Sequence, residues 1–390
     1  MLKYLSLKCV KYVIIFLFTS CWSVIYAQKY RPVQQSVVKS ISSLKYINTF
    51  VLPHKEQFRQ TTVGGLSSID YDPLTQTYYM VCDDRSTINP ARFYKAKITV
   101  SARGIQKVTI TGVDTLRQQD GSTYPKLAPN AIKTTDPEAM RYNGATQRLT
   151  WTSEGERIIT DKGNLLIDPT INIVSTDGRY ADTIPLPANL RMHVTESGPR
   201  QNGVLEGLTF ADNFNTLYVN LEEPLYQDGP RAGLERNNAF IRIYRFDLKN
   251  KRNTAQYAYQ LEPVAHPPTK KGDAINNGIP DILWLGADRF LITERSFSGG
   301  PSTNIKVFLA SIKQADNVIG VQSIKENPVA HPVQKKLLVN MDDLGVYVDN
   351  IEGATLGPVL PNGHQSIIFV ADDNFLAHEQ SQFMLFEVIP

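Results

Sequence analysis

One short pattern occurs five times along this chain of 390 residues, and it limits the folds open to the chain. Each copy has a glycine or acidic entry, an apolar run, a turn, a second run rich in aromatic and β-branched residues, and a carboxylate exit. The entries of the five copies are Gly65, Glu138, Glu206, Asp281 and Glu352. The intervals between them are 73, 68, 75 and 71 residues. Regular internal repeats on this scale predict an array of similar structural units.

Each copy has the chemistry of a β-hairpin, because its two apolar runs flank residues that form tight turns. The second copy turns at Asn143-Gly144 and the third at Asp212-Asn213. Two further strand-like runs follow each hairpin, as at 241–246 and 257–259. Four antiparallel strands per repeat are typical of a β-propeller blade. The sequence therefore predicts an all-β propeller with five blades, and a sixth, more diverged blade stays open.

The last repeat ends too early to complete a blade. After the run at 382–388 the chain stops, with three strands of that repeat made. The run at 46–52 precedes the first hairpin and resembles the outer strands of other repeats. We therefore predict that the N-terminal strand completes the last blade and closes the ring, which hides an exposed sheet edge.

The first 27 residues have the features of a secretory signal peptide. Three lysines precede the apolar run 13–18, small residues follow, and Ala27 stands just before Gln28. A second interpretation stays open, because 18–21 resembles a lipoprotein box that would leave a lipid anchor on Cys21. The apolar run is short for a membrane span. Both interpretations predict a secreted or periplasmic protein.

The rest of the chain predicts a polar lead-in over 28–45 and one propeller domain over 46–390. Cys82 is the one cysteine left after removal of the leader, so no intramolecular disulfide can form. Stability must therefore come from packing and ring closure. The net charge is +3, and acidic and basic residues are interspersed. We expect no nucleic-acid partner, since a strongly basic stretch is missing from the sequence. We also expect a monomer.

Antiparallel pairing brings the entry and the exit of each hairpin to the same end of the blade. All blades of a propeller share one orientation around a central channel. Acidic entries and exits should therefore gather around one mouth of that channel. They are Asp83, Glu138, Glu154, Glu206, Glu222, Asp281, Glu294, Glu352 and Asp372.

Close carboxylates resist ionisation unless a cation compensates their charge. Calcium takes many oxygen ligands, and arginine binds the oxygens of anions in pairs. We expect a divalent cation, calcium, on Glu138, Glu206, Glu222, Asp281, Glu294 and Glu352. Glu206, Glu352, Glu138 and Asp281 are the candidate catalytic residues. Arg85, Arg157 and Arg295 are the candidate ligands of a small anionic or ester substrate.

Two alternatives stay open beside this hydrolase. Acids at strand ends also accept backbone N–H bonds or pair with neighbouring arginines, so any one of them can be purely structural. The propeller would then be a binding module without catalysis, because propellers host both kinds of function. A serine esterase has little support, since Gly65-Leu66-Ser67-Ser68-Ile69 lacks the closing glycine of a nucleophile elbow. Zinc-helix, nucleotide-loop and paired-cysteine motifs are also missing from the sequence.

Six short segments together resemble one secreted bacterial family. They are Gly64-Gly65-Leu66-Ser67, Asp136-Pro137-Glu138-Ala139-Met140, Leu205-Glu206-Gly207-Leu208, Ile279-Pro280-Asp281, Asn350-Ile351-Glu352-Gly353 and Leu291-Ile292-Thr293-Glu294-Arg295-Ser296. The chain thus resembles the phytase-like, or "esterase-like activity of phytase", domain over roughly 46–390. The resemblance implies a propeller-like fold and hydrolysis of phosphoric or other esters. Related propeller phytases imply calcium in an acidic channel.

Overall fold

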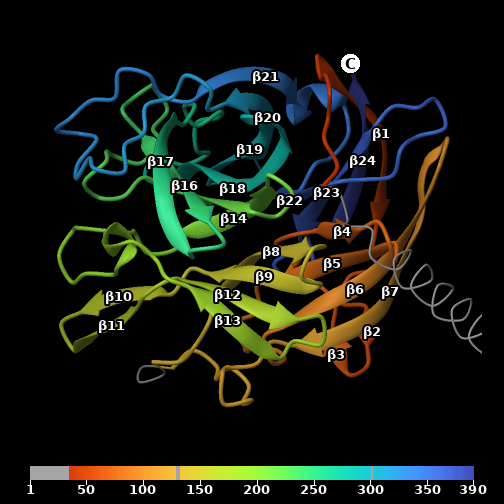
Figure 1. Cartoon of the computed structure of the whole chain (residues 1–390), viewed down its shortest axis with the longest axis horizontal. Helices are drawn as coiled ribbons and strands as arrows, with labels where there is room; N and C mark the ends of the chain where they lie inside the picture. Colours follow the sequence, from red (N-terminus) through yellow and green to blue (C-terminus); the bar gives the residue numbers. More distant parts are fainter. Residues whose placement is uncertain (1–34, 129–131, 300–301) are drawn as a thin grey trace, which may run out of the picture. The chain divides into compact units, whose positions relative to one another are not determined.

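The computed structural model describes residues 35–128, 132–299 and 302–390. Its main elements are five four-stranded antiparallel sheets, the blades (Figure 1). Blade 1 contains β4 (Asp70–Asp72), β5 (Thr77–Cys82), β6 (Arg92–Ser101) and β7 (Gly104–Thr115). Blade 2 contains β8 (Pro137–Asn143), β9 (Arg148–Ser153), β12 (Thr170–Ser175) and β13 (Tyr180–Ile184).

The other three blades have the same order from the inner to the outer strand. Blade 3 contains β14 (Leu205–Ala211), β15 (Thr216–Leu221), β16 (Phe240–Asp247) and β17 (Arg252–Gln260). Blade 4 contains β18 (Ile275–Gly286), β19 (Arg289–Ser298), β20 (Ser302–Ser311) and β21 (Gln334–Asn340). Blade 5 contains β22 (Asn350–Leu356), β23 (Ser366–Asp372), β24 (Gln382–Ile389) and β1 (Ser43–Val51).

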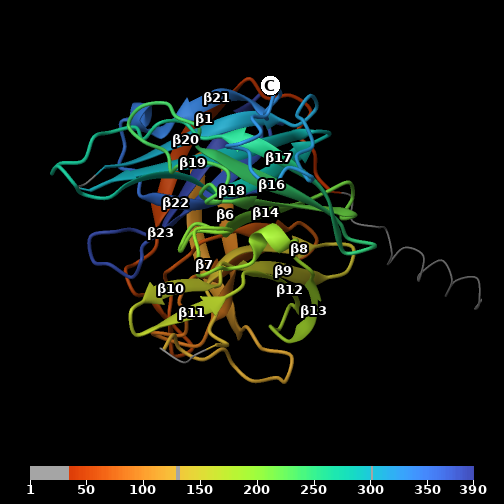
Figure 2. The same ribbon diagram turned by 90° about the vertical axis from the view of Figure 1, so that its left-hand side faces the viewer.

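The inner strands form a closed ring. β4 contacts β8, β8 contacts β14, β14 contacts β18, β18 contacts β22, and β22 returns to β4. Figure 2 shows the yellow sheet of blade 2 beside the green sheet of blade 3. The predicted five-bladed propeller is therefore confirmed.

The N-terminal strand closes this ring as predicted. β1 pairs antiparallel with β24, from Ser43 opposite Ile389 to Val51 opposite Gln382. It begins three residues before the predicted run at 46–52, and the hydrogen bond from Ser42 N to Ile389 O extends the contact. β24 is therefore covered, and β1 is the outer strand that completes blade 5.

Two short hairpins and two 3-10 helices lie outside the five described blades. The hairpins are β2 (Gln57–Phe58) with β3 (Thr61–Thr62), and β10 (Glu156–Thr160) with β11 (Gly163–Ile167). The 3-10 helices are η1 (Ala188–Leu190) and η2 (Met341–Leu344). Within the described ranges, no helix has the length and apolar character to cross a membrane. The predicted signal peptide and the Cys21 lipid site lie outside the described residues.

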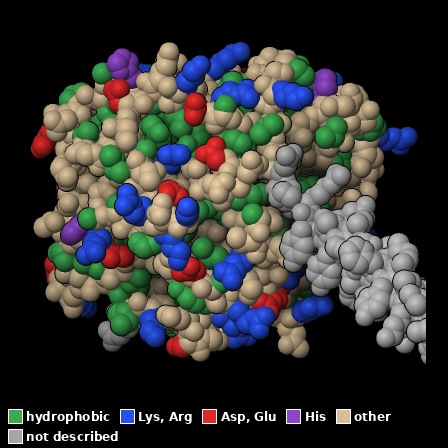
Figure 3. All heavy atoms as spheres, viewed as in Figure 1, with side chains coloured by type: hydrophobic (Ala, Val, Ile, Leu, Met, Phe, Trp, Pro, Cys, Tyr) green, Lys and Arg blue, Asp and Glu red, His purple; other side chains and the backbone are tan. Residues whose placement is uncertain are grey.

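The core lies between neighbouring blades. One cluster joins Leu208 of β14 to Ile282 of β18, and another joins Met140 of β8 to Val81 of β5. The inner strands β8 and β14 are buried along their whole length, because each sheet packs face to face against the sheets of its neighbours. Lys and Arg are interspersed with Asp and Glu on the face seen in Figure 3, in agreement with the small net charge.

Candidate functional site at one mouth of the channel

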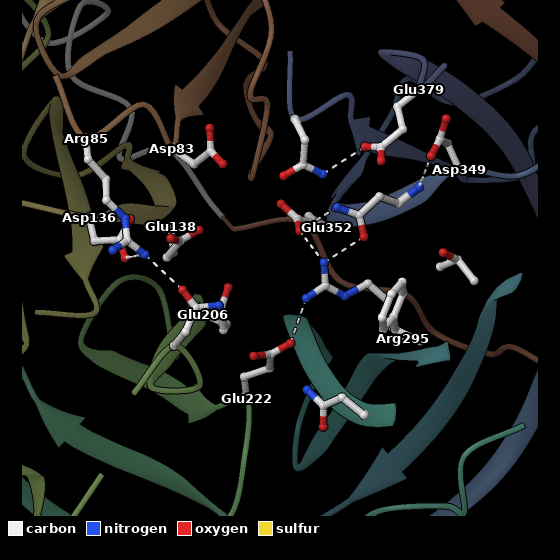
Figure 4. Close-up of a pocket in the computed structure, with 16 residues that line it drawn as sticks. Asp83, Arg85, Asp136, Glu138, Glu206, Glu222, Arg295, Asp349, Glu352 and Glu379 are labelled. Atoms are coloured by element: carbon white, nitrogen blue, oxygen red, sulfur yellow. Dashed lines mark hydrogen bonds and ion pairs between the residues drawn. The ribbon is translucent and has the colours of Figure 1, made fainter. Parts of the chain in front are cut away.

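A strongly polar cavity of about 530 Å³ lies where hairpin entries and exits meet (Figure 4). Two of the three predicted substrate-binding arginines, Arg85 and Arg295, line it. So do four of the six predicted metal ligands, Glu138, Glu206, Glu222 and Glu352. The other lining residues are Asp83, Asp136, Asn202, Asn276, Phe297, Thr303, Asp349, Asn350, Asn374 and Glu379.

A bulge in the inner strand places two of these acids. The pairing of β14 with β15 skips Glu206 between Leu205 and Gly207, and the pairing of β22 with β23 skips Glu352 in the same way. A bulged residue is left out of the ladder, which re-aims its side chain. In β8 the register also shifts between Pro137 and Met140, the stretch that contains Glu138.

The glycine after each bulged glutamate is required by the neighbouring blade. A Cβ on Gly207 would lie 2.8 Å from the Cα of Asp281, and a Cβ on Gly353 would lie 2.8 Å from the Cα of Ser68. Such separations are too short for any side chain. The Glu-Gly pairs of the repeats therefore combine an acid for the cavity with a close contact between inner strands.

Blade 4 departs from this pattern by one residue. Its register skips from Gly278 to Asp281, so Asp281 takes the ladder position that Gly207 has in blade 3. Glu294 correspondingly takes the position of Leu221, and Arg295 takes that of Glu222. A shift of one residue reverses the direction of every side chain in a strand.

The two acids of the fourth repeat consequently have other partners. Asp281 lies next to the Arg141 guanidinium, with Nη2 2.7 Å from each of its carboxylate oxygens. Glu294 accepts hydrogen bonds from Tyr259 Oη and Lys335 Nζ at 2.7 and 2.6 Å. Neither lines the cavity, so a metal or catalytic role for them stays an untested prediction.

Arg157, the third predicted substrate ligand, also lies outside the lining residues. Its guanidinium donates to His193 O at 2.9 Å, to Val194 O at 3.1 Å and to Tyr226 Oη at 3.2 Å. These bonds attach Arg157 to the backbone of the loop that follows η1, at His193 and Val194. Its role in substrate binding remains a prediction without support from this geometry.

Arg295 links three blades across the cavity, as Figure 4 shows. It donates to Glu222 Oε1 at 2.7 Å, to Asn350 Oδ1 at 2.6 Å and to Glu352 Oε1. On the other side of the cavity, Arg85 pairs with Asp136 and donates to Glu156 Oε2 at 3.0 Å and Asn202 Oδ1 at 2.8 Å. Both arginines are therefore fixed within the acidic lining.

A family model described as phytase-like, esterase-like activity of phytase, matches residues 61–375. The chain belongs to this family. Comparison with curated proteins gives no match.

Among solved structures, the phytase-like chain is similar to the periplasmic gluconolactonase of Pseudomonas aeruginosa at 11% identity, with 85% of this chain and 91% of that chain covered and a TM-score of 0.36. It is also similar to an exo-β-1,3-galactanase of Phanerochaete chrysosporium at 10% identity, with 88% and 65% covered and a TM-score of 0.44.

The acids of the phytase-like site are under strong mutual repulsion. Burial and neighbouring carboxylates raise the pKa of Glu138 and of Glu206 well above the ordinary value. Burial, with Glu222 nearby, raises the pKa of Glu154 to about 7, and burial with Glu352 nearby raises that of Asp83 to about 7. Two arginines thus compensate only part of the negative charge.

The donor set of the site fits a hard cation. Asp136, Glu138 and Glu154 each offer a carboxylate oxygen, and these three oxygens lie within 4.8 Å of one another. Oxygen donors grouped in this way suit calcium or magnesium. Asp136 and Glu154 were missing from the predicted metal ligands, although Asp136-Pro137-Glu138 places two acids on one face of a strand.

Ser67 is a further residue of the site that the sequence did not single out. Its hydroxyl lies 3.0 Å from Glu138 Oε2 and 2.8 Å from Glu352 Oε2. Its hydroxyl faces both carboxylates as a donor, so Ser67 links blades 1, 2 and 5.

Proposed function

We propose that this phytase-like domain is a hydrolase of phosphorylated or other ester substrates that works with a divalent cation in the acidic cavity. The observation that carries the proposal is the convergence of Asp136, Glu138 and Glu154. Their carboxylates are buried and their charge is only partly offset by Arg85. A bound cation would stabilise the ionised forms of all three.

Calcium is the cation we propose, because it accepts six to eight oxygen ligands in irregular geometry. When bound, the ion supplies Lewis-acid polarisation of a phosphoryl or carbonyl oxygen and lowers the pKa of a bound water. Asp136, Glu138 and Glu154 would hold it, with Glu206 beside them.

The protein's own residues have separate tasks in this proposal. Glu206 or Glu352 takes the proton of the attacking water, since a carboxylate with a raised pKa is a better base near neutral pH. Arg295 and Arg85 orient and bind the substrate oxygens through charge-assisted hydrogen bonds. The guanidinium of Arg295 is already fixed by Glu222 and Asn350, so little ordering is needed when substrate binds.

We also propose that the protein is secreted or periplasmic and acts as a monomer on a small molecule. The support is the leader sequence and the absence of a strongly basic stretch from the sequence.

The test is hydrolysis of a panel of phosphate and carboxylic esters by the purified protein, with calcium and with chelator. We expect turnover that needs calcium and is lost in Glu138→Gln. The matched control is Glu326→Gln, an exposed glutamate away from the cavity, which should keep full activity.

Other results would overturn the proposal. Ester cleavage that ignores chelator would exclude the cation from the reaction. No turnover on any ester, together with intact calcium binding, would favour the alternative of a binding module with structural carboxylates.

A further inference from the structure

One aromatic side chain interrupts the polar lining of the cavity. Among the described residues that line it, Phe297 is the one apolar member. Its side chain is 43% exposed, whereas Phe290 of the same strand is fully buried. Single exposed apolar residues are common on protein surfaces, so exposure alone does not indicate a binding site. What is unusual is that this exposed phenylalanine lies in the lining of a cavity that is otherwise polar.

The local burial pattern around Phe297 is inverted. Ser296 and Ser298, its neighbours in β19, are 5% and 1% exposed. A strand that packs one face on the core normally buries its apolar residues and exposes its polar ones. Here two serines point inward and the phenylalanine points out. Departures of this kind from the local pattern are expected at functional sites.

Phe297 is held on a rigid element. It lies opposite Asn276 of β18 and opposite Thr303 of β20, and both of these residues also line the cavity. Arg295 is two positions earlier in β19, so the two side chains leave the same face of the strand about 7 Å apart. An anionic group on Arg295 would therefore bring an attached ring within reach of Phe297.

A second aromatic residue, Tyr347, does not line the cavity but is bonded to a residue that does. Tyr347 is 56% exposed and donates a hydrogen bond of 3.0 Å to Asp349 Oδ2, and Asp349 lines the cavity. Asn350, the next residue of the chain, is bonded to Arg295. The sector between blades 4 and 5 therefore combines exposed aromatic surface with Arg295, while the three proposed metal ligands belong to blade 2.

We propose that the substrate carries an aromatic or similarly flat apolar group beside its anionic ester group, and that this group lies on Phe297. The proposal rests on the proposed function, because it needs an anion held at Arg295 and the cation. The apolar group gains by leaving water and by stacking on the ring. Phe297 is then a specificity-determining residue, and small aliphatic esters are poorer substrates than aryl esters.

Two inert probes isolate this contribution. Phenylphosphonate and methylphosphonate have the same anionic head and differ in the ring. Titration calorimetry with the calcium-loaded protein should give about tenfold tighter binding of phenylphosphonate, as expected for one stacked, partly exposed ring. Phe297→Ala should abolish that preference and leave methylphosphonate binding unchanged. Phe297→Tyr keeps a ring and should keep the preference.

The control is Leu337→Ala, which removes a side chain that is 46% exposed on the outer strand β21. It should change neither affinity, and the melting temperature of each variant verifies folding. Equal binding of both phosphonates to the unaltered protein, or a preference that survives in Phe297→Ala, would overturn the role of Phe297 and leave the proposed hydrolase intact. If neither phosphonate bound, the proposed function and this inference would both fall.

Discussion

Arg141 donates from Nη2 to both carboxylate oxygens of Asp281, at 2.7 Å each, and joins blade 2 to blade 4 through the centre of the ring. Arg141 also donates to Ile69 O of blade 1 at 2.8 Å and to Ala354 O of blade 5 at 3.1 Å. Both side chains are 2% exposed. One guanidinium thus connects four blades of the ring.

Breaking this pair should destabilise the fold. Asp281→Asn leaves the Arg141 charge buried without a counter-ion, which typically costs about 3–5 kcal/mol. Urea unfolding should show the loss as a lower midpoint. Removing the exposed partner of Asp177 by Arg179→Met should cost less than about 1 kcal/mol. A stable Asp281→Asn protein that had lost activity would instead support the catalytic role predicted from the sequence.

The close approach of blades 3 and 4 predicts a strong effect of one methyl group. Gly207→Ala would place its Cβ 2.4 Å from Asn220 Oδ1 as well as against Asp281. Overpacking of this kind costs about 1–3 kcal/mol, and we expect thermal unfolding at a lower temperature. Gly320→Ala is the matched control, because nothing lies within 4 Å of its Cβ. Equal melting temperatures for the two variants would contradict the close packing.

The raised pKa values predict how the calcium-free protein responds to pH. The pKa of Asp83 and of Glu154 is about 7 in the folded state, above that of an unfolded chain. The folded state then binds more protons at these two groups, so their contribution to stability is full below about pH 4 and is lost as the pH rises through about 7. Calcium should reverse the trend, since it binds the ionised carboxylates. Melting temperatures measured from pH 4.5 to 8, with chelator and with calcium, test this.

Two results would count against that linkage. A melting temperature in chelator that rises steadily to pH 7 would mean that the cavity carboxylates are already ionised and compensated. A calcium effect of equal size at pH 4.5 and at pH 8 would mean that the ion binds elsewhere.

Arg295 should act on cation binding and on turnover in opposite directions. Arg295→Met removes the positive charge next to Glu222 and Glu352, so the cavity becomes more negative and calcium should bind more tightly. Turnover should fall by about 100-fold, because a donor to the substrate oxygens is lost. Calcium titration and kcat/KM measure the two effects. A parallel loss of both would indicate that Arg295 only holds the structure together.

The fold could be predicted from the sequence because its information is local. Turn formers such as Asn143-Gly144 separate the two strands of each hairpin, and the early end of the last repeat required the strand now seen as β1. Antiparallel pairing then fixes which ends of the hairpins share a face. That reasoning placed Glu138, Glu206, Glu222, Glu352, Arg85 and Arg295 at one cavity.

The exact members of the site were decided by tertiary structure. The extra residues of the β18 bulge, Ile279 and Pro280, put Asp281 and Glu294 out of register with the acids of the other repeats. Proline has no N–H for the ladder, but the sequence does not say which neighbouring residue leaves the pairing. A shift of one residue turned an apparent cavity acid into the partner of Arg141 and brought Arg295 to the mouth. Repeats in the sequence determine the blades, whereas the register within each blade determines which side chains meet in the cavity.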